Sequence, residues 1–351
     1  MADGPHRQQD RSCSMILDRC IAAATLTAGL GVAGAFAQDR TFYYVSPDPI
    51  GLNPFLQMGE AGIRAAADAH DAGAVVIESD TPQSRLENVS AAANDGADIV
   101  VVLGFEFSDI LRDIAPLYPD TQFLIVDQCI WDDRPDNISC AVFREHESAF
   151  LMGAVAGLAS QADKVAVVSA IDIPFLHRYT DAFAAGARHV APDTQSEVRW
   201  VGGQNPFADP VRAKEQALAL AAGGADVIFS ATAGGDFGVF EAAQEQGFTV
   251  TTVDVNHCPA APGRILDGTL KRVDEVIGTS IDRILAGERS FVATYGLAEG
   301  GMGAISLLPD AELAESGCLV ADRPEIVAQV RDLAAQIVDG SLTVADPMAA
   351  D

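Results

Sequence analysis

Short apolar runs alternate with longer amphipathic segments along most of the chain. The runs are rich in Val and Ile and lack strict apolar–polar alternation, which is typical of parallel strands covered on both faces. We predict strands over Phe42–Val45, Ala74–Ile77, Ile99–Leu103, Gln122–Val126, Val165–Ser169, Val198–Val201, Val227–Ser230 and Val250–Val253. We predict helices over Gln57–His70, Leu86–Ala93, Ser108–Ala115, Ser148–Ala159, Leu176–His189, Val211–Ala222 and Asp236–Glu245. This repeated alternation indicates doubly wound parallel sheets.

The alternation runs through the chain twice. The first pass ends near Ala141–Val142, and the second begins with Lys164–Ser169. We therefore predict an α/β fold of two doubly wound parallel-sheet lobes joined by a hinge. The expected N-terminal lobe is 38–145 plus 256–292, and the expected C-terminal lobe is 146–255 plus 293–351. Ligands of such sheets bind beyond the carboxyl ends of the strands.

The first 37 residues differ from the rest. Three arginines precede an uncharged run, Ile21–Ala37, that ends in Ala-Phe-Ala. This is the pattern of a cleavable signal peptide over residues 1–37, and Met15 is an alternative start. Charged residues just before Cys20 argue against lipid attachment. We therefore expect a periplasmic protein.

The chain is strongly acidic, with 50 Asp and Glu against 22 Lys and Arg and a formal net charge of -28. A surface of this sign repels phosphate backbones and anionic lipids, so we expect no nucleic-acid partner and no membrane-surface partner. The acidic residues are spread along the chain, which is typical of a solubilising surface.

Four cysteines follow the predicted signal peptide: Cys129, Cys140, Cys258 and Cys318. An even number in an oxidising compartment permits two disulfides. Cys129 and Cys140 flank a polar loop, so we favour that pair, with Cys258–Cys318 as the second. Four cysteines allow three pairings, and the sequence alone leaves the choice open. No C-x-x-C spacing favours zinc.

Enzyme signatures are lacking. The five histidines after residue 37 are scattered, and there is no H-E-x-x-H, G-x-G-x-x-G or Walker motif. A nucleoside hydrolase would need clustered aspartates near the first strand, where Asp48 stands alone. We expect no enzyme, no metal and no cofactor. His257 is interpreted as a solvated or disulfide-flanking residue, and His177 and Arg178 as solvated or capping residues.

Polar residues at strand ends are the binding candidates. Asp127 and Asp254 follow apolar runs, and a carboxylate can accept hydrogen bonds from a vicinal diol. Turn formation or helix capping is the alternative role for either Asp. Lys271 is one of three lysines in the chain. Three aromatic residues could stack on a flat ring or could simply cover the core: Phe207, Phe55 and, as a third candidate, Phe175.

An ordered set of short motifs runs from Asp39 to about Leu308. They are Leu52-Asn53 with Gly59; Pro116, Pro119, Phe123 and Asp127; Phe143 to Glu147 with Phe150, Leu151 and Gly153; Asn205 to Pro210; Val253-Asp254 with Pro262, Gly268, Lys271 and Asp274; and Gly296-Leu297 with Gly300, Gly301 and Gly303. In this order, they resemble the motifs of the basic membrane protein family of solute-binding proteins, the PnrA-like group serving nucleoside ABC transporters.

The resemblance implies a type I periplasmic binding protein with three hinge crossings and a purine nucleoside between its lobes. By position, it implies that Asp254 and Lys271 bind the ribose and that Asn53 and Asp127 are polar contacts. It implies Phe207 or Phe55 as the stacking residue. The partners would be a small-molecule ligand and an inner-membrane ABC permease, and we expect a monomer.

One departure leaves the ligand class open. Many relatives carry an acidic pair and an aromatic residue before the first Asn, whereas this chain has Pro49 and Leu52 there. The ligand could therefore be a nucleoside, a free nucleobase, a sugar or another small heterocycle. A sensory protein that presents its ligand to a receptor is the alternative to transport. In either role, we expect the ligand to favour hinge closure.

Overall fold

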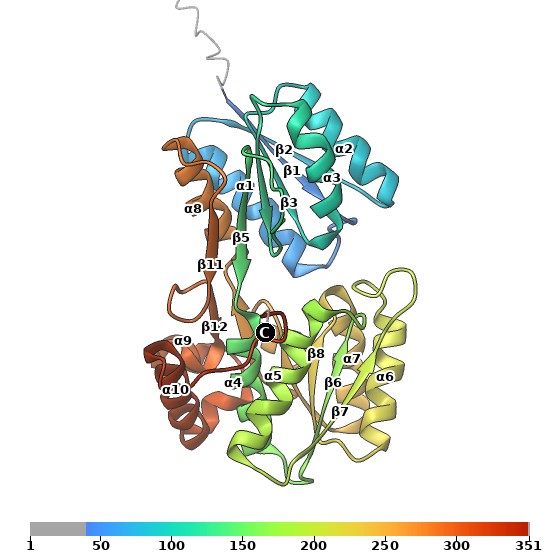
Figure 1. Cartoon of the computed structure of the whole chain (residues 1–351). Coiled ribbons are helices and arrows are strands. Elements are labelled where there is room, and N and C mark those ends of the chain that lie inside the picture. Colours follow the sequence, from blue (N-terminus) through green and yellow to red (C-terminus); the bar gives the residue numbers. More distant parts are fainter. Residues whose placement is uncertain (1–39, 350–351) are drawn as a thin grey trace, which may run out of the picture. The chain divides into compact units, whose positions relative to one another are not determined.

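The computed structural model describes residues 40–349, which contain two six-stranded sheets (Figure 1). The first has the order β11-β5-β4-β3-β1-β2, with every neighbouring pair parallel. Its strands are β1 (Thr41–Ser46), β2 (Gly73–Glu78), β3 (Ile99–Leu103), β4 (Gln122–Val126), β5 (Ile138–Phe143) and β11 (Val292–Tyr295). The predicted signal peptide, 1–37, lies outside the described residues.

The second sheet has the order β12-β10-β9-β8-β6-β7, and only β12 runs antiparallel to its neighbour. Its strands are β6 (Lys164–Ser169), β7 (Gln195–Trp200), β8 (Val227–Ala231), β9 (Thr249–Thr252), β10 (Ile265–Lys271) and β12 (Met302–Ala304). The predicted fold class, α/β with two doubly wound and largely parallel sheets, is confirmed.

Helices cover both faces of the first sheet. They are α1 (Pro54–Ala69), α2 (Pro82–Asn94), α3 (Ser108–Ile114) and α8 (Val273–Leu285). Successive residues of β1 enter different cores: Tyr44 packs in the core that includes α1 and α8, and Tyr43 in the core that includes α2 and α3. Burial on both faces explains why the strand sequences do not alternate.

The helices of the second sheet are α4 (Glu145–Ala159), α5 (Pro174–Val190), α6 (Pro210–Ala222), α7 (Asp236–Gln246), α9 (Asp310–Glu315) and α10 (Pro324–Asp339). Two glycines let α4 and α5 approach closely. A Cβ at Gly153 would overlap the Phe183 carbonyl oxygen, and a Cβ at Gly186 would overlap that of Phe150. Since α4 begins immediately after β5, this tight packing fixes how the chain enters the second sheet.

Within the described residues, the chain passes between the sheets three times: from β5 to α4, from β10 to α8 and from β11 to β12 (Figure 1). The predicted lobe boundaries differ from this at two places. Residues 256–271 end in β10, which pairs with β9 and β12 and so belongs to the second sheet. Residues 293–295 belong to β11, which pairs with β5 in the first. The boundary near 256 was misplaced because β10 carries polar residues at buried positions.

None of the helices within residues 40–349 has the length and apolar composition needed to cross a membrane.

Candidate functional site

Asp127 and Asp254 occupy matching positions in the two sheets, just beyond β4 and β9. Both have left-handed backbones, with φ of 75° and 73°, a conformation that Asp tolerates better than most residues. The Asp127 N–H donates to the Ala141 carbonyl at 2.8 Å, and the Asp254 N–H donates to Thr269 Oγ1 at 3.2 Å. These turns place one carboxylate at the carboxyl edge of each sheet, where open α/β sheets bind ligands.

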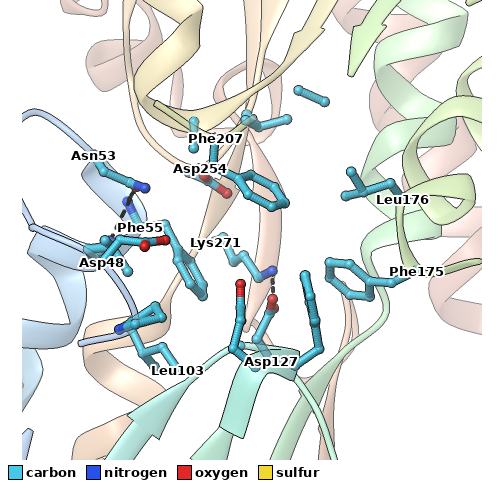
Figure 2. A pocket seen from close by; sticks show the side chains of 18 of the residues that line it. Asp48, Asn53, Phe55, Leu103, Asp127, Phe175, Leu176, Phe207, Asp254 and Lys271 are labelled. Atoms are coloured by element: carbon cyan, nitrogen blue, oxygen red, sulfur yellow. Dashed lines mark hydrogen bonds and ion pairs between the residues drawn. The ribbon is translucent and has the colours of Figure 1, made fainter. Parts of the chain in front are cut away.

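Lys271, the last residue of β10, joins the two edges. Its side chain is 2% exposed, and its ammonium forms an ion pair with Asp127 (Figure 2). The same Nζ lies 3.1 Å from Glu145 Oε1 and 3.3 Å from the Tyr179 hydroxyl. Three oxygen partners thus satisfy the three donors of a buried ammonium.

Charge and aromatic rings both keep Lys271 protonated. Burial alone would lower its pKa, but Asp127, Tyr179 and Glu145 hold the pKa well above its usual value. Its Nζ also lies 4.8 Å from the centroid of Phe143 and 5.3 Å from that of Phe55, within cation–π range. The cavity therefore contains a fixed positive charge.

Glu145, the first residue of α4, extends this network. It is fully buried, and burial raises its pKa to about 7 despite the nearby Lys271. Its Oε2 accepts from Arg178 Nη1 at 3.1 Å, and Arg178 donates to both carboxylate oxygens of Asp346, at 2.8 and 2.6 Å. Arg178 is only 14% exposed, so the interpretation of it as a solvated or capping residue was wrong. By contrast, His177 pairs with surface Asp172 and Asp181.

The Asp254 side chain is 8% exposed and lines the cavity. Within residues 40–349, its carboxylate receives no hydrogen bond from a protein group. Burial raises its pKa to about 6, although Lys271 acts to lower it. A buried carboxylate without a donor destabilises the empty protein, so Asp254 is available to accept hydrogen bonds from a ligand.

Glu106 is a second cavity carboxylate that has no hydrogen bond or ion pair with another described residue, and it was not among the residues predicted from the sequence. It lies in a short 3-10 turn, Phe105–Phe107, immediately after β3. Burial raises its pKa to about 7, although its own backbone N–H and Arg85 act to lower it; Asp48 and Asp127 raise it further. Its position at a strand end was the available signal.

Two aromatic rings from different sheets face each other across the site. Phe105 follows β3 and is 36% exposed, and Phe207 lies in the loop before α6. Their centroids are 6.5 Å apart with an interplanar angle of 51°. Phe207 was a predicted stacking candidate, whereas Phe105 was not.

The other predicted aromatic candidates lie closer to the ammonium. Phe55 and Phe175 both line the cavity, and both lie within 6 Å of Lys271 Nζ. Phe175 also packs edge-on against Tyr179, at 6.1 Å. Their rings form an apolar wall around the ion pair. Exclusion of water by this wall strengthens the electrostatic interaction.

Asn53 lines the cavity but also caps α1. Its Oδ1 accepts from the backbone N–H of Phe55 at 3.1 Å and of Leu56 at 3.4 Å. Nearby, Asp48 is paired with Arg85 at 3.0 Å. The Asn53 oxygen and the Asp48 carboxylate are therefore already engaged, unlike those of Asp254 and Glu106.

The cavity bounded by these residues is open to solvent and contains about 690 Å³ of empty space. It brings together all seven residues predicted to bind the ligand: Asn53, Phe55, Asp127, Phe175, Phe207, Asp254 and Lys271. It also contains Phe105, Glu106 and Tyr179, which were not among the residues predicted from the sequence. The arrangement offers an aromatic pair, a fixed ammonium and two uncommitted carboxylates.

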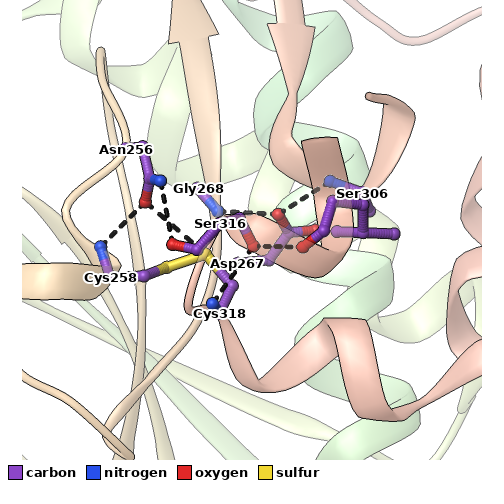
Figure 3. The surroundings of a disulfide bond; sticks show 8 residues. Asn256, Cys258, Asp267, Gly268, Ser306, Ser316 and Cys318 are labelled. Atoms are coloured by element: carbon purple, nitrogen blue, oxygen red, sulfur yellow. Dashed lines mark hydrogen bonds between the residues drawn. A yellow bond between two sulfur atoms is a disulfide. The ribbon is translucent and has the colours of Figure 1, made fainter. Parts of the chain in front are cut away.

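Both favoured disulfides are present, Cys129–Cys140 and Cys258–Cys318. Around the second, the Asn256 side chain accepts from the Cys258 N–H at 2.9 Å and donates to the Ser316 carbonyl at 3.0 Å (Figure 3). The neighbouring His257 ring packs against Phe237 and Phe240, and burial lowers its pKa to about 4. His257 is therefore a neutral core residue beside the disulfide, and the interpretation of it as solvated was wrong.

No group of three or more His, Cys, Asp or Glu residues in the described part of the chain is arranged to hold a metal ion.

Comparisons with known proteins relate the chain to a family of binding proteins. A family model described as ABC transporter substrate-binding protein PnrA-like matches residues 42–327. The chain is 27% identical over 275 residues to a CD4+ T-cell-stimulating antigen of Listeria innocua, covering 73% of this chain and 72% of that protein. It is 25% identical over 249 residues to the ABC transporter nucleoside-binding protein BmpA of Lactococcus lactis, covering 66% of this chain and 70% of that one.

Among solved structures, an ABC transporter solute-binding protein from Aeropyrum pernix has a TM-score of 0.78 at 22% identity, covering 88% of this chain and 94% of the other. That likeness identifies the fold as the type I periplasmic binding fold. The family match covers most of the chain, and its members bind small molecules for a permease and are not enzymes. The chain therefore belongs to the family of PnrA-like ABC transporter substrate-binding proteins.

Proposed function

We propose that this protein binds a purine nucleoside, or a related nucleobase, in the cavity between its two sheets. In this proposal it acts in the periplasm as a monomer and delivers the ligand to an inner-membrane ABC permease. The observation that carries the proposal is the Asp254 carboxylate, buried beside Lys271 and without a protein donor in the described chain.

A ribose fits the polar end of the cavity. Asp254 can accept hydrogen bonds from two vicinal hydroxyls, and Asp127 offers a further acceptor. Lys271 can donate to a ribose hydroxyl in place of its 3.3 Å contact with the Tyr179 hydroxyl. Charge-assisted hydrogen bonds of this kind are stronger than neutral ones. In this arrangement Asn53 contributes through its amide nitrogen, which has no hydrogen-bond acceptor among residues 40–349, because its oxygen caps α1.

A flat base fits the aromatic end. Phe105 and Phe207 come from different sheets and their centroids lie only 6.5 Å apart, so a ring stacked on one of them lies close to the other. The nucleoside-binding name of the Lactococcus relative supports the same ligand class. A ligand that contacts both sheets gains contacts only when they approach each other, so binding favours the closed form.

A thermal-shift screen tests the proposal. The protein is first unfolded and refolded to remove any carried-over ligand, then screened against nucleosides, free bases and sugars. Ligand at about 100 times its Kd stabilises by about 2.7 kcal/mol, which corresponds to a shift of about 5 °C.

A shift with purine nucleosides that is lost in Asp254→Asn supports the proposal, and Asp113→Asn, an exposed change on α3, is the matched control. A shift with bases alone retains the stacking pair but removes the ribose roles of Asp254 and Lys271. A shift with sugars alone, or none at all, overturns the proposed ligand class.

A further inference from the structure

Glu106 is the cavity carboxylate for which the ribose contacts provide no role. Of the acidic groups lining the site, Asp48 is paired with Arg85 and Asp127 with Lys271. Asp254 and Glu106 are left without a hydrogen bond or ion pair to another residue of the described chain. They come from different sheets, and Asp254 is more than nine-tenths buried.

The backbone before Glu106 makes room for its carboxylate. Gly104 has φ of 95°, a conformation that residues with side chains rarely adopt. A Cβ at Gly104 would also lie only 2.5 Å from Glu106 Oε2. Glycine at this turn therefore allows the carboxylate to fold back over the end of β3 and line the cavity.

The strand order places Glu106 away from the end of the cavity that contains Asp127 and Lys271. At the edge of the first sheet, Asp127 follows β4, Glu106 follows β3 and Asp48 follows β1, in that spatial order. In the second sheet, Lys271 lies on β10, which leads into a crossing. If the ribose binds at Asp127 and Lys271, the ring extends toward β3, where Phe105 precedes Glu106 in the chain.

We propose that Glu106 is a specificity-determining residue that selects nucleosides of 6-oxopurines with adjacent ring and amino N–H donors, as in guanosine, over 6-aminopurine nucleosides such as adenosine. This inference rests on the proposed function. An ionised carboxylate only accepts hydrogen bonds, so it matches two adjacent donors. Adenine presents one amino N–H donor beside a ring nitrogen that carries a lone pair. A carboxylate oxygen placed opposite that nitrogen would be repelled by the lone pair. A site built for a donor rejects an analogue that lacks it.

The test compares the dissociation constants of guanosine and adenosine for the wild type and Glu106→Gln at pH 8.5, where Glu106 is ionised. Glu312→Gln, an exposed change on α9, is the matched control. We expect the wild type and the control to bind guanosine at least about tenfold more tightly than adenosine. Glu106→Gln offers one acceptor and one donor, which match adenine, so the preference should fall at least tenfold.

An unchanged preference in correctly folded Glu106→Gln, or a wild-type preference for adenosine, overturns this inference alone, because both results require that nucleosides bind. Failure of the wild type to bind either nucleoside overturns the proposed function, and this inference with it. Circular dichroism and Tm verify folding, which we expect to be preserved because Glu106 has no partner to lose among the described residues.

Discussion

Lys271 at the end of β10 and Asp127 just beyond β4 form an ion pair that joins the carboxyl edges of the two sheets. The pair lies next to a crossing, since α8 begins two residues after Lys271. It is therefore placed both to contact a ligand and to link the two sheets.

Replacing the ammonium should destabilise the protein. Lys271→Met leaves the buried Asp127 and Glu145 without their shared cation, and breaking a buried pair in this way costs about 3–5 kcal/mol of unfolding free energy. Urea denaturation of ligand-free protein measures the loss. The double variant Lys271→Met/Asp127→Asn should recover part of it, because one uncompensated charge is removed.

The surface lysine Lys214, which pairs with Glu241 and Glu245, is the control, and Lys214→Met should change stability little. Equal stability of Lys271→Met and the wild type would contradict the structural role of the buried pair.

Asp254→Asn should separate binding from stability. Loss of the charged acceptor should weaken nucleoside binding at least tenfold, or about 1.4 kcal/mol. Because burial raises the pKa of Asp254 to about 6, its ionised form destabilises the empty protein at higher pH. The variant should therefore have an equal or higher Tm at pH 8. Calorimetric titration and a melting curve measure the two effects, and an unchanged affinity would exclude Asp254 from the site.

Nucleoside affinity should fall in acid. Asp254 accepts donors only when ionised, so with a pKa of about 6 in the empty protein it loses this capacity as pH drops through 6. Its charged neighbours in the cavity are Lys271 and Asp127. Below pH 6, affinity should decrease by up to about tenfold per pH unit.

Glu106, with a pKa of about 7, would add its own dependence, so titrations use the Glu106→Gln background. In the Glu106→Gln background, nucleoside affinity should decrease between pH 6.5 and 5 when residue 254 is Asp. It should not decrease in the Asp254→Asn variant. The same slope in both proteins would assign the effect to another group.

Removing the two disulfides should have unequal effects. Cys258 and Cys318 close a loop of 60 residues, whereas Cys129 and Cys140 close one of 11. Loop-closure entropy predicts losses of roughly 4 and roughly 3 kcal/mol for replacement of each pair by alanine. Denaturation of the two double variants measures the difference. A smaller loss for the 258–318 pair would show that loop entropy does not control their contribution.

Sequence patterns predict most of the strands that are apolar on both faces, although β5, which is buried throughout, was not among the predicted strands. Each predicted strand and helix overlaps an observed element, because runs such as Ile99–Leu103 are fully buried. The strand β10 escaped prediction because Asp267, Thr269 and Lys271 interrupt its apolar pattern. Asp267 is tolerated there because its Oδ1 accepts from two backbone N–H groups, of Gly268 and Ser306.

Site residues that directly follow a strand can be predicted from the sequence, whereas site residues on helices are harder to predict. Asp127 and Asp254 stand directly after apolar runs, so their place at the sheet edge follows from the pattern. Glu145 and Tyr179 lie on helices α4 and α5, and only the packing of those helices brings them to Lys271. No local pattern encodes that contact.

The most direct test of the account compares guanosine with 2′,3′-dideoxyguanosine by isothermal titration calorimetry, using refolded, ligand-free protein at pH 8. The base is the same in both, so the difference reports the hydroxyl contacts assigned to Asp254 and the Asp127–Lys271 pair. We predict that guanosine binds and that the dideoxy analogue binds at least about tenfold more weakly. Equal affinities would contradict the hydroxyl contacts assigned to Asp254 and the Asp127–Lys271 pair, and failure to bind either guanosine or adenosine would contradict the assignment of this cavity as a nucleoside site.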